Sequence, residues 1–267
     1  MVIEISDQEF ARFQGFIFEA AGITLGPSKK ALVSGRLEKR LRHHRLQSYS
    51  EYLSLLASQS NPEEIQQAID LLTTNETYFF REQRHFELLR ERAEAARKQR
   101  RPLRVWSAAC STGEEPYSIA MVLAELQADL PWELLASDIS TKVLKRARIG
   151  HYPESRTTQI PLELRKRFCL KGTGEHAGTM LVERGLRQRV NFMQINLDRP
   201  LPAIGNFDLI FLRNVMIYFS TDTKRRVVAR LLPQLREDGL LLVGHSETLN
   251  DVSDDVVALR PSIYQRR

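Results

Sequence analysis

The sequence predicts an all-α domain followed by an α/β domain with a mostly parallel, doubly wound sheet. Three observations support this: helical apolar spacing fills residues 6–95, strand-like runs alternate with helical segments after residue 101, and 267 residues exceed the usual size of one domain. We expect a helical domain over residues 1–75 and the α/β domain over residues 76–267.

The first predicted helix begins near Ser6 and Asp7, which are both good N-cap residues. Its apolar residues recur at helical spacing, and the sequence "GITLGP" then ends it. "SYSEYLSLL" and "NPEEIQQAIDLL" predict two further short helices, the second capped by Asn61 with Pro62 at its first position.

Another predicted helix, over residues 28–46, has a basic face. Its apolar stripe consists of Leu32, Val33, Leu37 and Leu41, and the opposite face carries Lys29, Arg36, Lys39, Arg40 and His43. Such a face suits an acidic partner, although a solvated helix surface would have the same composition.

Five apolar runs after residue 101 predict the strands of the sheet: "LRVWSAA", "WELLASD", "VNFMQIN", "FDLIFLRN" and "GLLLVGH". Residues 168–190 interrupt this alternation with glycines, β-branched residues and no clear helical period. We expect a small antiparallel β insertion there.

Composition narrows the class of protein. The net charge of +6 permits nucleic acid, acidic lipid or an acidic protein as partner, without choosing among them. Cys110 and Cys169 form no CxxC pair and the six histidines show no metal-binding spacing, so we expect no disulfide scaffold and no metal site. No apolar leader or membrane-spanning run occurs, which predicts a cytoplasmic protein.

Small residues follow the first predicted strand, from Ser107 to Gly113, where a ligand could approach the backbone closely. Asp138 ends the second strand 25 residues after Gly113, near the spacing at which dinucleotide folds place an acid on ribose hydroxyls. Further polar residues, Asn196, Arg213 and Asn214, end later strands. The alternative is that the glycine serves only the packing of a tight turn.

Glu114 and Glu115 stand at the start of the following helix, where a pyrophosphate would need bare amides. Two carboxylates there disfavour a nicotinamide cofactor and favour a phosphate-free, positively charged adenosine compound such as S-adenosylmethionine. In the alternative interpretation they merely complement the helix dipole.

Long blocks of this sequence resemble the chemotaxis receptor glutamate methyltransferases: "TTNETYFFRE", "RVWSAACSTGEEPYSIAM", "ASDIS", "INL", "FDLIFLRNVMIYF" and "DGLLLVGHSE". The resemblance spans nearly the whole chain, in order. It implies a Rossmann-like S-adenosylmethionine-dependent methyltransferase domain with a small antiparallel β insertion, behind an all-α domain. It also implies methyl esterification of glutamates on bacterial chemoreceptors, with S-adenosylhomocysteine as product.

The resemblance also implies site residues. Arg81 and Tyr218 would be catalytic, near the transferred methyl, although Tyr218 could instead be a core or interface aromatic. The cofactor would contact Asn75, Thr77, Arg81, Glu115, Asp138, Asn196, Leu197, Arg213 and Asn214. Because a glutamate is ionised at neutral pH, the reaction needs no general base, which agrees with the lack of a nucleophile-and-base motif.

The implied partner is the cytoplasmic helical bundle of chemoreceptors, met through the basic helix at residues 29–45 and the β insertion. We expect neither nucleic-acid binding nor membrane insertion. The alternatives are a methyltransferase acting on another protein or on nucleic acid, a non-catalytic adaptor that senses the cofactor, and a nicotinamide oxidoreductase.

Overall fold

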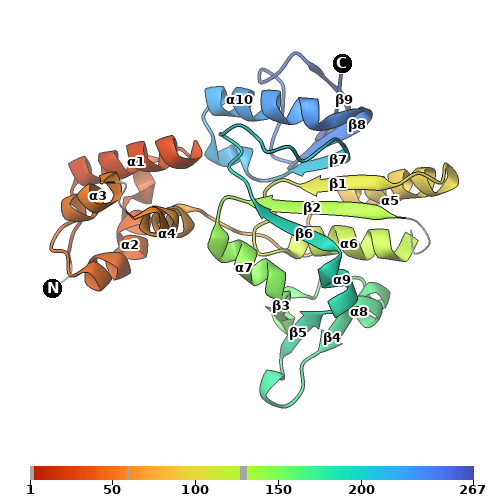
Figure 1. The fold of residues 1–267 in the computed structure, drawn as a ribbon, viewed down its shortest axis with the longest axis horizontal. Helices are drawn as coiled ribbons and strands as arrows, with labels where there is room; N and C mark the ends of the chain where they lie inside the picture. Colours follow the sequence, from red (N-terminus) through yellow and green to blue (C-terminus); the bar gives the residue numbers. More distant parts are fainter. Residues whose placement is uncertain (1–2, 59–60, 127–130) are drawn as a thin grey trace.

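The structure, a computed structural model, describes residues 3–58, 61–126 and 131–267. A cluster of helices lies to one side of a twisted sheet with helices on both faces, and a smaller sheet projects below it in the view of Figure 1, beyond the strand β6. Within the described residues, no helix combines the length and apolar content needed to cross a membrane.

The helical cluster consists of α1 (Asp7–Ala21), α2 (Lys30–His44), α3 (Tyr49–Ala57) and α4 (Pro62–Leu72). Ser6 caps α1 in a reciprocal capping box with Glu9, and Asn61 caps α4, as predicted. The apolar faces meet in one core, in which Phe13, Ile17 and Leu37 are fully buried.

The main sheet has the strand order β6-β2-β1-β7-β8-β10-β9. Its five parallel strands are those predicted: β1 (Leu103–Ser107), β2 (Trp132–Asp138), β6 (Val190–Gln194), β7 (Phe207–Leu212) and β8 (Leu235–Val243). The antiparallel strands β9 (Val256–Arg260) and β10 (Ile263–Arg266) extend one edge and were not predicted.

Helices cover both faces of this sheet. Successive residues of β1 point to opposite faces, so Val105 packs with α5 (Gln83–Lys98) and α6 (Glu114–Leu126), whereas Trp106 packs with α10 (Thr221–Leu231). The helix α7 (Thr141–Ile149) follows β2 and contacts both β2 and β6. This arrangement confirms the predicted fold class.

A small antiparallel sheet of order β3-β5-β4 is inserted between α7 and β6. Its strands are β3 (His151–Pro153), β5 (Thr179–Val182) and β4 (Cys169–Lys171), with α8 (Leu162–Phe168) between β3 and β4. The predicted segment 168–190 supplies β4 and β5, but β3 lies upstream of it and the short helix α9 (Arg184–Gln188) lies inside it. A five-residue helix is too short to show a period in the sequence.

Candidate active site

A pocket of about 940 Å³, including its part open to solvent, lies at the carboxyl ends of the parallel strands. Its walls come from the end of α1, from residues 73–81, and from the loops after β1, β2, β6 and β7. The helical domain covers this edge directly: Ile23 forms a β-bridge with Phe219, and the Thr24 N–H donates to the carbonyl of Tyr218 at 2.8 Å.

The structure brings all the predicted site residues into this one pocket. Its lining includes Asn75, Thr77, Arg81, Glu115, Asp138, Asn196, Leu197, Arg213, Asn214 and Tyr218. They come from five separate stretches of the chain, so their convergence is a property of the fold. Their individual contacts differ, and these contacts limit what each side chain can do.

The segment 73–82 is held against both domains. Arg36 of α2 donates to the carbonyls of Leu71 and Thr73, at 3.1 and 2.8 Å. Ser111 Oγ donates to the Asn75 carbonyl at 2.9 Å, and Arg156 donates to the Thr77 carbonyl at 2.9 Å. The segment therefore presents side chains to the pocket from a fixed backbone.

The three rings of this segment differ in role. Phe79 is fully buried against Tyr152, and Phe80 packs against Phe86, with ring centroids 5.0 Å apart in both pairs. Tyr78 is exposed and lines the pocket, with the guanidinium of Arg81 5.5 Å from its ring centroid. Phe79 and Phe80 therefore fix the segment by packing, whereas Tyr78 belongs to the pocket wall.

Arg81 and Tyr218 lie in the same electrostatic environment. Arg81 donates from Nη1 to the Glu76 carbonyl at 3.2 Å. Burial raises the pKa of Tyr218, while the charge of Arg81 lowers it. A protonated phenol and a guanidinium are both hydrogen-bond donors, so this part of the pocket suits an anion.

Arg213 is almost completely buried and joins the opening segment to the sheet. Its guanidinium lies 3.0 Å from Glu82 and 2.8 Å from Glu115, and it also donates to the carbonyl of Arg81. One guanidinium thus pairs with two carboxylates. Arg213 positions Arg81 and Glu115 as well as lining the pocket.

The two glutamates at the start of α6 have different positions. Glu115 lines the pocket, bound by Ser107 Oγ at 2.7 Å and by Arg213. Glu114 is fully buried outside the pocket lining and pairs with Arg156 at 2.7 Å. The prediction that both would face a ligand is wrong for Glu114, because its helical position turns it toward the insertion.

Asp138 is buried at the end of β2. Its carboxylate accepts the backbone N–H of Ser111 and of Ser140, both at 2.9 Å. Burial raises its pKa to about 6, although these two hydrogen bonds act in the opposite direction. Each oxygen keeps a further lone pair, so Asp138 can still accept hydroxyl donors from a ligand.

Two predicted asparagines are engaged in the protein itself. Asn196 Nδ2 donates to the Ala20 carbonyl of α1 at 2.8 Å, and its Oδ1 accepts the Asp198 N–H. Asn214 Nδ2 donates to Glu82 at 3.2 Å, and its backbone has a positive φ of 56°. These side chains hold the walls in place, which the sequence alone did not predict.

Gly113 supports the packing alternative. With φ at +99°, its position favours glycine, and an added Cβ would lie 2.8 Å from the Tyr152 hydroxyl and 2.9 Å from Ala147 Cβ. It lies outside the pocket lining, whereas Ala108, Ala109 and Ser111 of the same loop belong to it. The small residues before the glycine are thus the ones that a ligand can approach.

Sequence reasoning missed several apolar and polar wall residues: Ala21, Ile23, Thr73, Thr74, Glu76, Phe86, Ile139, Ile195, Val215 and Phe219. The sequence could have indicated Ile139 as a wall residue, because it directly follows Asp138, the acid that ends β2. Nothing in the sequence indicated Ala21 and Ile23, because only the tertiary structure brings the end of α1 to the sheet.

The lining fits an adenosine compound without phosphates. Asp138 can accept ribose hydroxyls, and Ile139 and Leu197 offer apolar surface for a base. Arg213 already has two carboxylate partners, so it is a poor phosphate ligand. Glu115 adds negative charge that suits a cationic group, although its pairing with Arg213 reduces this effect.

Comparisons with known proteins agree with this geometry. Residues 8–73 match the family "CheR methyltransferase, all-alpha domain", and residues 75–263 match "CheR methyltransferase, SAM binding domain". Chemotaxis protein methyltransferase 2 of Pseudomonas aeruginosa is 45% identical over 260 residues, covering 96% of this chain and 92% of that protein. The chemotaxis protein methyltransferase of Escherichia coli is 43% identical over 265 residues, covering 98% of this chain and 92% of that protein.

Among solved structures, the glycopeptide N-methyltransferase MtfA with bound S-adenosylmethionine is similar at 16% identity and a TM-score of 0.34, covering 58% of this chain and 48% of that one. Magnesium protoporphyrin IX methyltransferase from Synechocystis, also with bound S-adenosylmethionine, is similar at 16% identity and a TM-score of 0.35, covering 68% and 76%.

Proposed function

The chain belongs to the CheR methyltransferase family, with S-adenosylmethionine as cofactor, and from this we propose that it methylates glutamate side chains of bacterial chemoreceptors. The products would be glutamyl methyl esters, which serve chemotaxis adaptation. The observation that carries the proposal is that Arg81 and Tyr218 line the same cofactor-sized pocket, where both can donate hydrogen bonds to an incoming carboxylate.

The chemistry needs no proton transfer before methyl transfer. The cofactor supplies a methyl group on a sulfonium, and a glutamate carboxylate is already an ionised nucleophile at neutral pH. Among the described residues that line the pocket, none is a lysine, histidine or cysteine. Glu115 and Asp138 are occupied by hydrogen bonds from the protein, so neither is well placed as a general base.

We assign the remaining roles from the contacts. Arg81 and Tyr218 orient the acceptor carboxylate, and Asp138 binds the ribose hydroxyls. Arg213 fixes the backbone of Arg81, and Asn196 keeps the end of α1 over the pocket. Closure by the helical domain would exclude water from the reacting groups.

We propose the chemoreceptor bundle as the partner. Of the basic residues predicted at 29–45, fewer are free to meet it than the sequence indicated. Arg36 and Arg40 are used inside the domain, by the carbonyls of residues 71–73 and by Glu64. Lys29, Lys39 and His43 remain exposed and can meet acidic receptor helices. The inserted sheet exposes Leu170 as a second contact point. This assignment places the enzyme in the cytoplasm.

The test uses purified protein, S-adenosylmethionine labelled in the methyl group, and cytoplasmic fragments of chemoreceptors. We expect label on receptor glutamates that alkali releases as methanol. Arg81→Ala should lower kcat by about 100-fold while the Kd of the cofactor changes less than about threefold, since the loss is of acceptor orientation.

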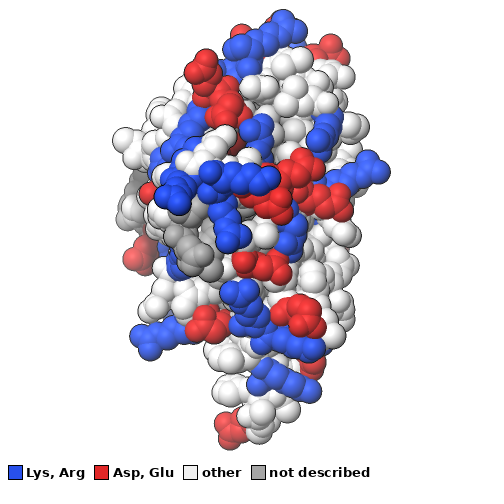
Figure 2. All heavy atoms as spheres, turned by 90° about the vertical axis from the view of Figure 1, so that its right-hand side faces the viewer, with Lys and Arg blue, Asp and Glu red and all other residues white. Residues whose placement is uncertain are grey.

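Arg97→Ala is the matched control, because it removes an exposed arginine in the last turn of α5, outside the pocket lining and outside the proposed docking surface. The face of the molecule opposite the helical domain carries basic and acidic side chains intermixed (Figure 2). Label that resists alkali would indicate methylation of nitrogen and a different acceptor. An absence of transfer to any receptor fragment, with normal cofactor binding, would favour a cofactor-sensing adaptor. Either result contradicts the proposal.

A further inference from the structure

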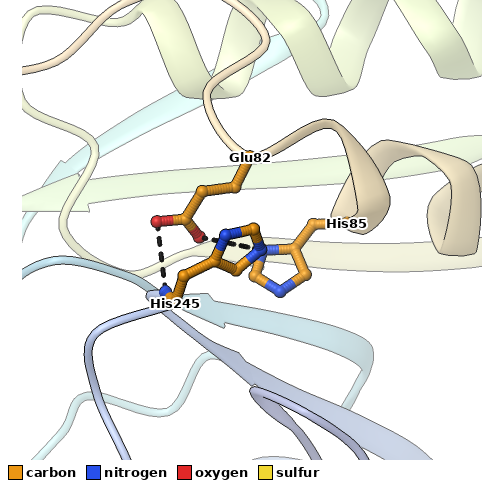
Figure 3. A group of neighbouring side chains, drawn as sticks. All are labelled: Glu82, His85 and His245. Atoms are coloured by element: carbon orange, nitrogen blue, oxygen red, sulfur yellow. Dashed lines mark hydrogen bonds and ion pairs between the residues drawn. The ribbon is translucent and has the colours of Figure 1, made fainter.

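Three side chains outside the pocket lining lie close together: Glu82, His85 and His245 (Figure 3). Glu82 is also the ion-pair partner of Arg213. Glu82 and His85 stand at the start of α5, whereas His245 follows β8, so the fold alone brings them together. Glu82 Oε2 lies 3.5 Å from His85 Nδ1 and 3.9 Å from His245 Nε2. All three ligand atoms lie within 4.8 Å of one another.

The hydrogen bonds of His85 define its tautomer. Ser262 Oγ donates its proton to the Pro261 carbonyl at 2.6 Å, so it accepts from His85 Nε2 at 2.9 Å. The proton of a neutral ring is therefore on Nε2, and Nδ1 carries a lone pair. That lone pair points toward the carboxylate of Glu82 (Figure 3).

Two hydrogen-bond acceptors, Glu82 Oε2 and His85 Nδ1, thus face each other in the protein interior. Glu82 Oε2 and His85 Nδ1 have almost no solvent contact. Within residues 3–58, 61–126 and 131–267, His85 Nδ1 has no hydrogen-bond partner, and the partner of Glu82 Oε2 with opposite charge is Arg213, at 3.0 Å. His85 is fully buried. Such a pair is unfavourable unless a positive species lies between the two atoms.

The surrounding charges permit a cation. Arg213 lies 3.0 Å from Glu82 Oε2, but its other side pairs with Glu115, so the cluster has more carboxylate than guanidinium charge. Glu247 adds another carboxylate beside it, accepting the N–H groups of Gly244 and Asn214. The local charge before a metal binds is therefore negative.

We propose that Glu82, His85 and His245 bind one divalent first-row transition metal, with Zn²⁺ as the best match. Bonds of about 2.0–2.1 Å in a tetrahedron place ligand atoms about 3.3–3.4 Å apart. The observed separations are 3.5 and 3.9 Å from Glu82 and at most 4.8 Å between the two histidines, so metal binding requires side-chain movement, which the half-exposed His245 can make. The half-exposed His245 gives the ion access from solvent and leaves a fourth position for water.

Such a metal would cross-link the start of α5 to the turn after β8. Glu82 Oε1 already accepts the His245 N–H at 3.1 Å and the Asn214 side chain at 3.2 Å, so the link would reinforce a contact between two separate segments. Its role is structural, because none of the three ligands belongs to the pocket lining that contains Arg81 and Tyr218. A ligand that binds only the folded state raises the unfolding temperature.

The experiment titrates untagged, metal-free protein with Zn²⁺ at pH 7.5, by calorimetry and by competition with a chromogenic chelator. We expect one equivalent to bind and the unfolding temperature to rise. His245→Ala should weaken binding at least tenfold and remove the rise. Co²⁺ in place of Zn²⁺ should give visible absorption bands of a nitrogen-and-oxygen site, which the variant lacks.

His176→Ala is the control, because it removes an exposed histidine from the inserted sheet. It should bind Zn²⁺ like the unaltered protein. Circular dichroism checks the fold of each variant, and His245→Gln replaces His245→Ala if the latter unfolds. The proposal is overturned if the unaltered protein binds no equivalent of Zn²⁺, or if His245→Ala and His245→Gln bind it unchanged.

Discussion

Asp138 shows how one buried carboxylate serves both a loop and a ligand. It accepts two backbone N–H groups, which fix the turns after β1 and β2, and it still lines the pocket. Burial strengthens the hydrogen bonds that the carboxylate can accept from hydroxyl groups, and it also raises the pKa of Asp138 to about 6. Its charge therefore changes near neutral pH.

We predict that acidification through pH 6 weakens cofactor binding, because ribose hydroxyls donate stronger hydrogen bonds to the carboxylate than to the protonated acid. The Kd should rise by up to about tenfold per pH unit below pH 6. The unbound protein should respond in the opposite direction. Since the folded pKa is above the unfolded value of 3.8, this group gives the most stability at low pH.

Asp138→Asn provides the check by calorimetry between pH 5 and 8. It should raise the Kd at pH 8 by about 10- to 100-fold, through loss of charge-assisted hydrogen bonds of about 1.5–3 kcal/mol, and should remove this pH dependence. A variant whose affinity still falls below pH 6 would assign the titration to another group.

Single residues also show where sequence reasoning reaches its limit. The acid at the end of β2 was predictable because strand ends meet at one edge of a parallel sheet. The buried ion pair between Glu114 and Arg156 was not predictable, because Arg156 belongs to an insertion whose position depends on the whole fold. The same holds for His245, which lies 160 residues beyond His85 in the chain.

At the scale of elements, apolar runs predicted the five parallel strands well, including the edge strand β6, of which only Val190 is buried. They failed for β9, where four of five residues are exposed at the sheet edge, and for β3, which has three residues and ends in proline. Exposed or very short strands depend on their neighbours rather than on their own pattern. The positions of strand ends were therefore more predictable than the edges of the sheets.

The packing of α2, α3 and α4 depends on one buried acid. Glu64 of α4 accepts Tyr52 of α3 at 2.6 Å and Arg40 of α2 at 2.9 Å, and it lies 3.0 Å from His44. Burial alone would raise the pKa of Glu64, but hydrogen bonds from Arg40, Tyr52 and His44 outweigh it and lower the pKa to about 2.

Glu64→Gln should therefore destabilise the protein by about 1–3 kcal/mol at pH 7, since it leaves Arg40 without its charge partner. Because the folded pKa is lowered, the stabilisation by Glu64 is present above about pH 4.5 and is lost as the pH falls toward 2. Urea unfolding measures it, and the difference between the proteins should shrink on acidification. Glu63→Gln, at the exposed neighbouring position, should change stability by less than about 0.5 kcal/mol.

For the whole molecule, the pocket is complete only when the two domains meet. The α/β domain supplies the strand ends, whereas Ala21, Ile23 and the held segment 73–82 close the opposite side. The helical domain lies against that edge of the sheet (Figure 1). Domain arrangement is thus part of the site, and the sequence indicated it only through the resemblance in the "TTNETYFFRE" block.

Arg36 connects these parts, because it reaches from α2 to the carbonyls of Leu71 and Thr73. We predict that Arg36→Ala raises the Kd of S-adenosylmethionine by about 10-fold, since releasing two hydrogen bonds of about 0.5–1.5 kcal/mol each loosens the segment that carries Asn75 and Thr77. Hydrogen exchange should become faster over residues 73–81 and remain unchanged in β1 and β2.

Lys39→Ala on the same helix is the matched control, and it should alter neither the Kd nor the exchange, because Lys39 is exposed to solvent. If Arg36 served instead as part of a basic docking face, Arg36→Ala would reduce methylation of the receptor while cofactor affinity stayed the same. Measuring both quantities on both variants therefore separates a link between the domains from a contact with the partner.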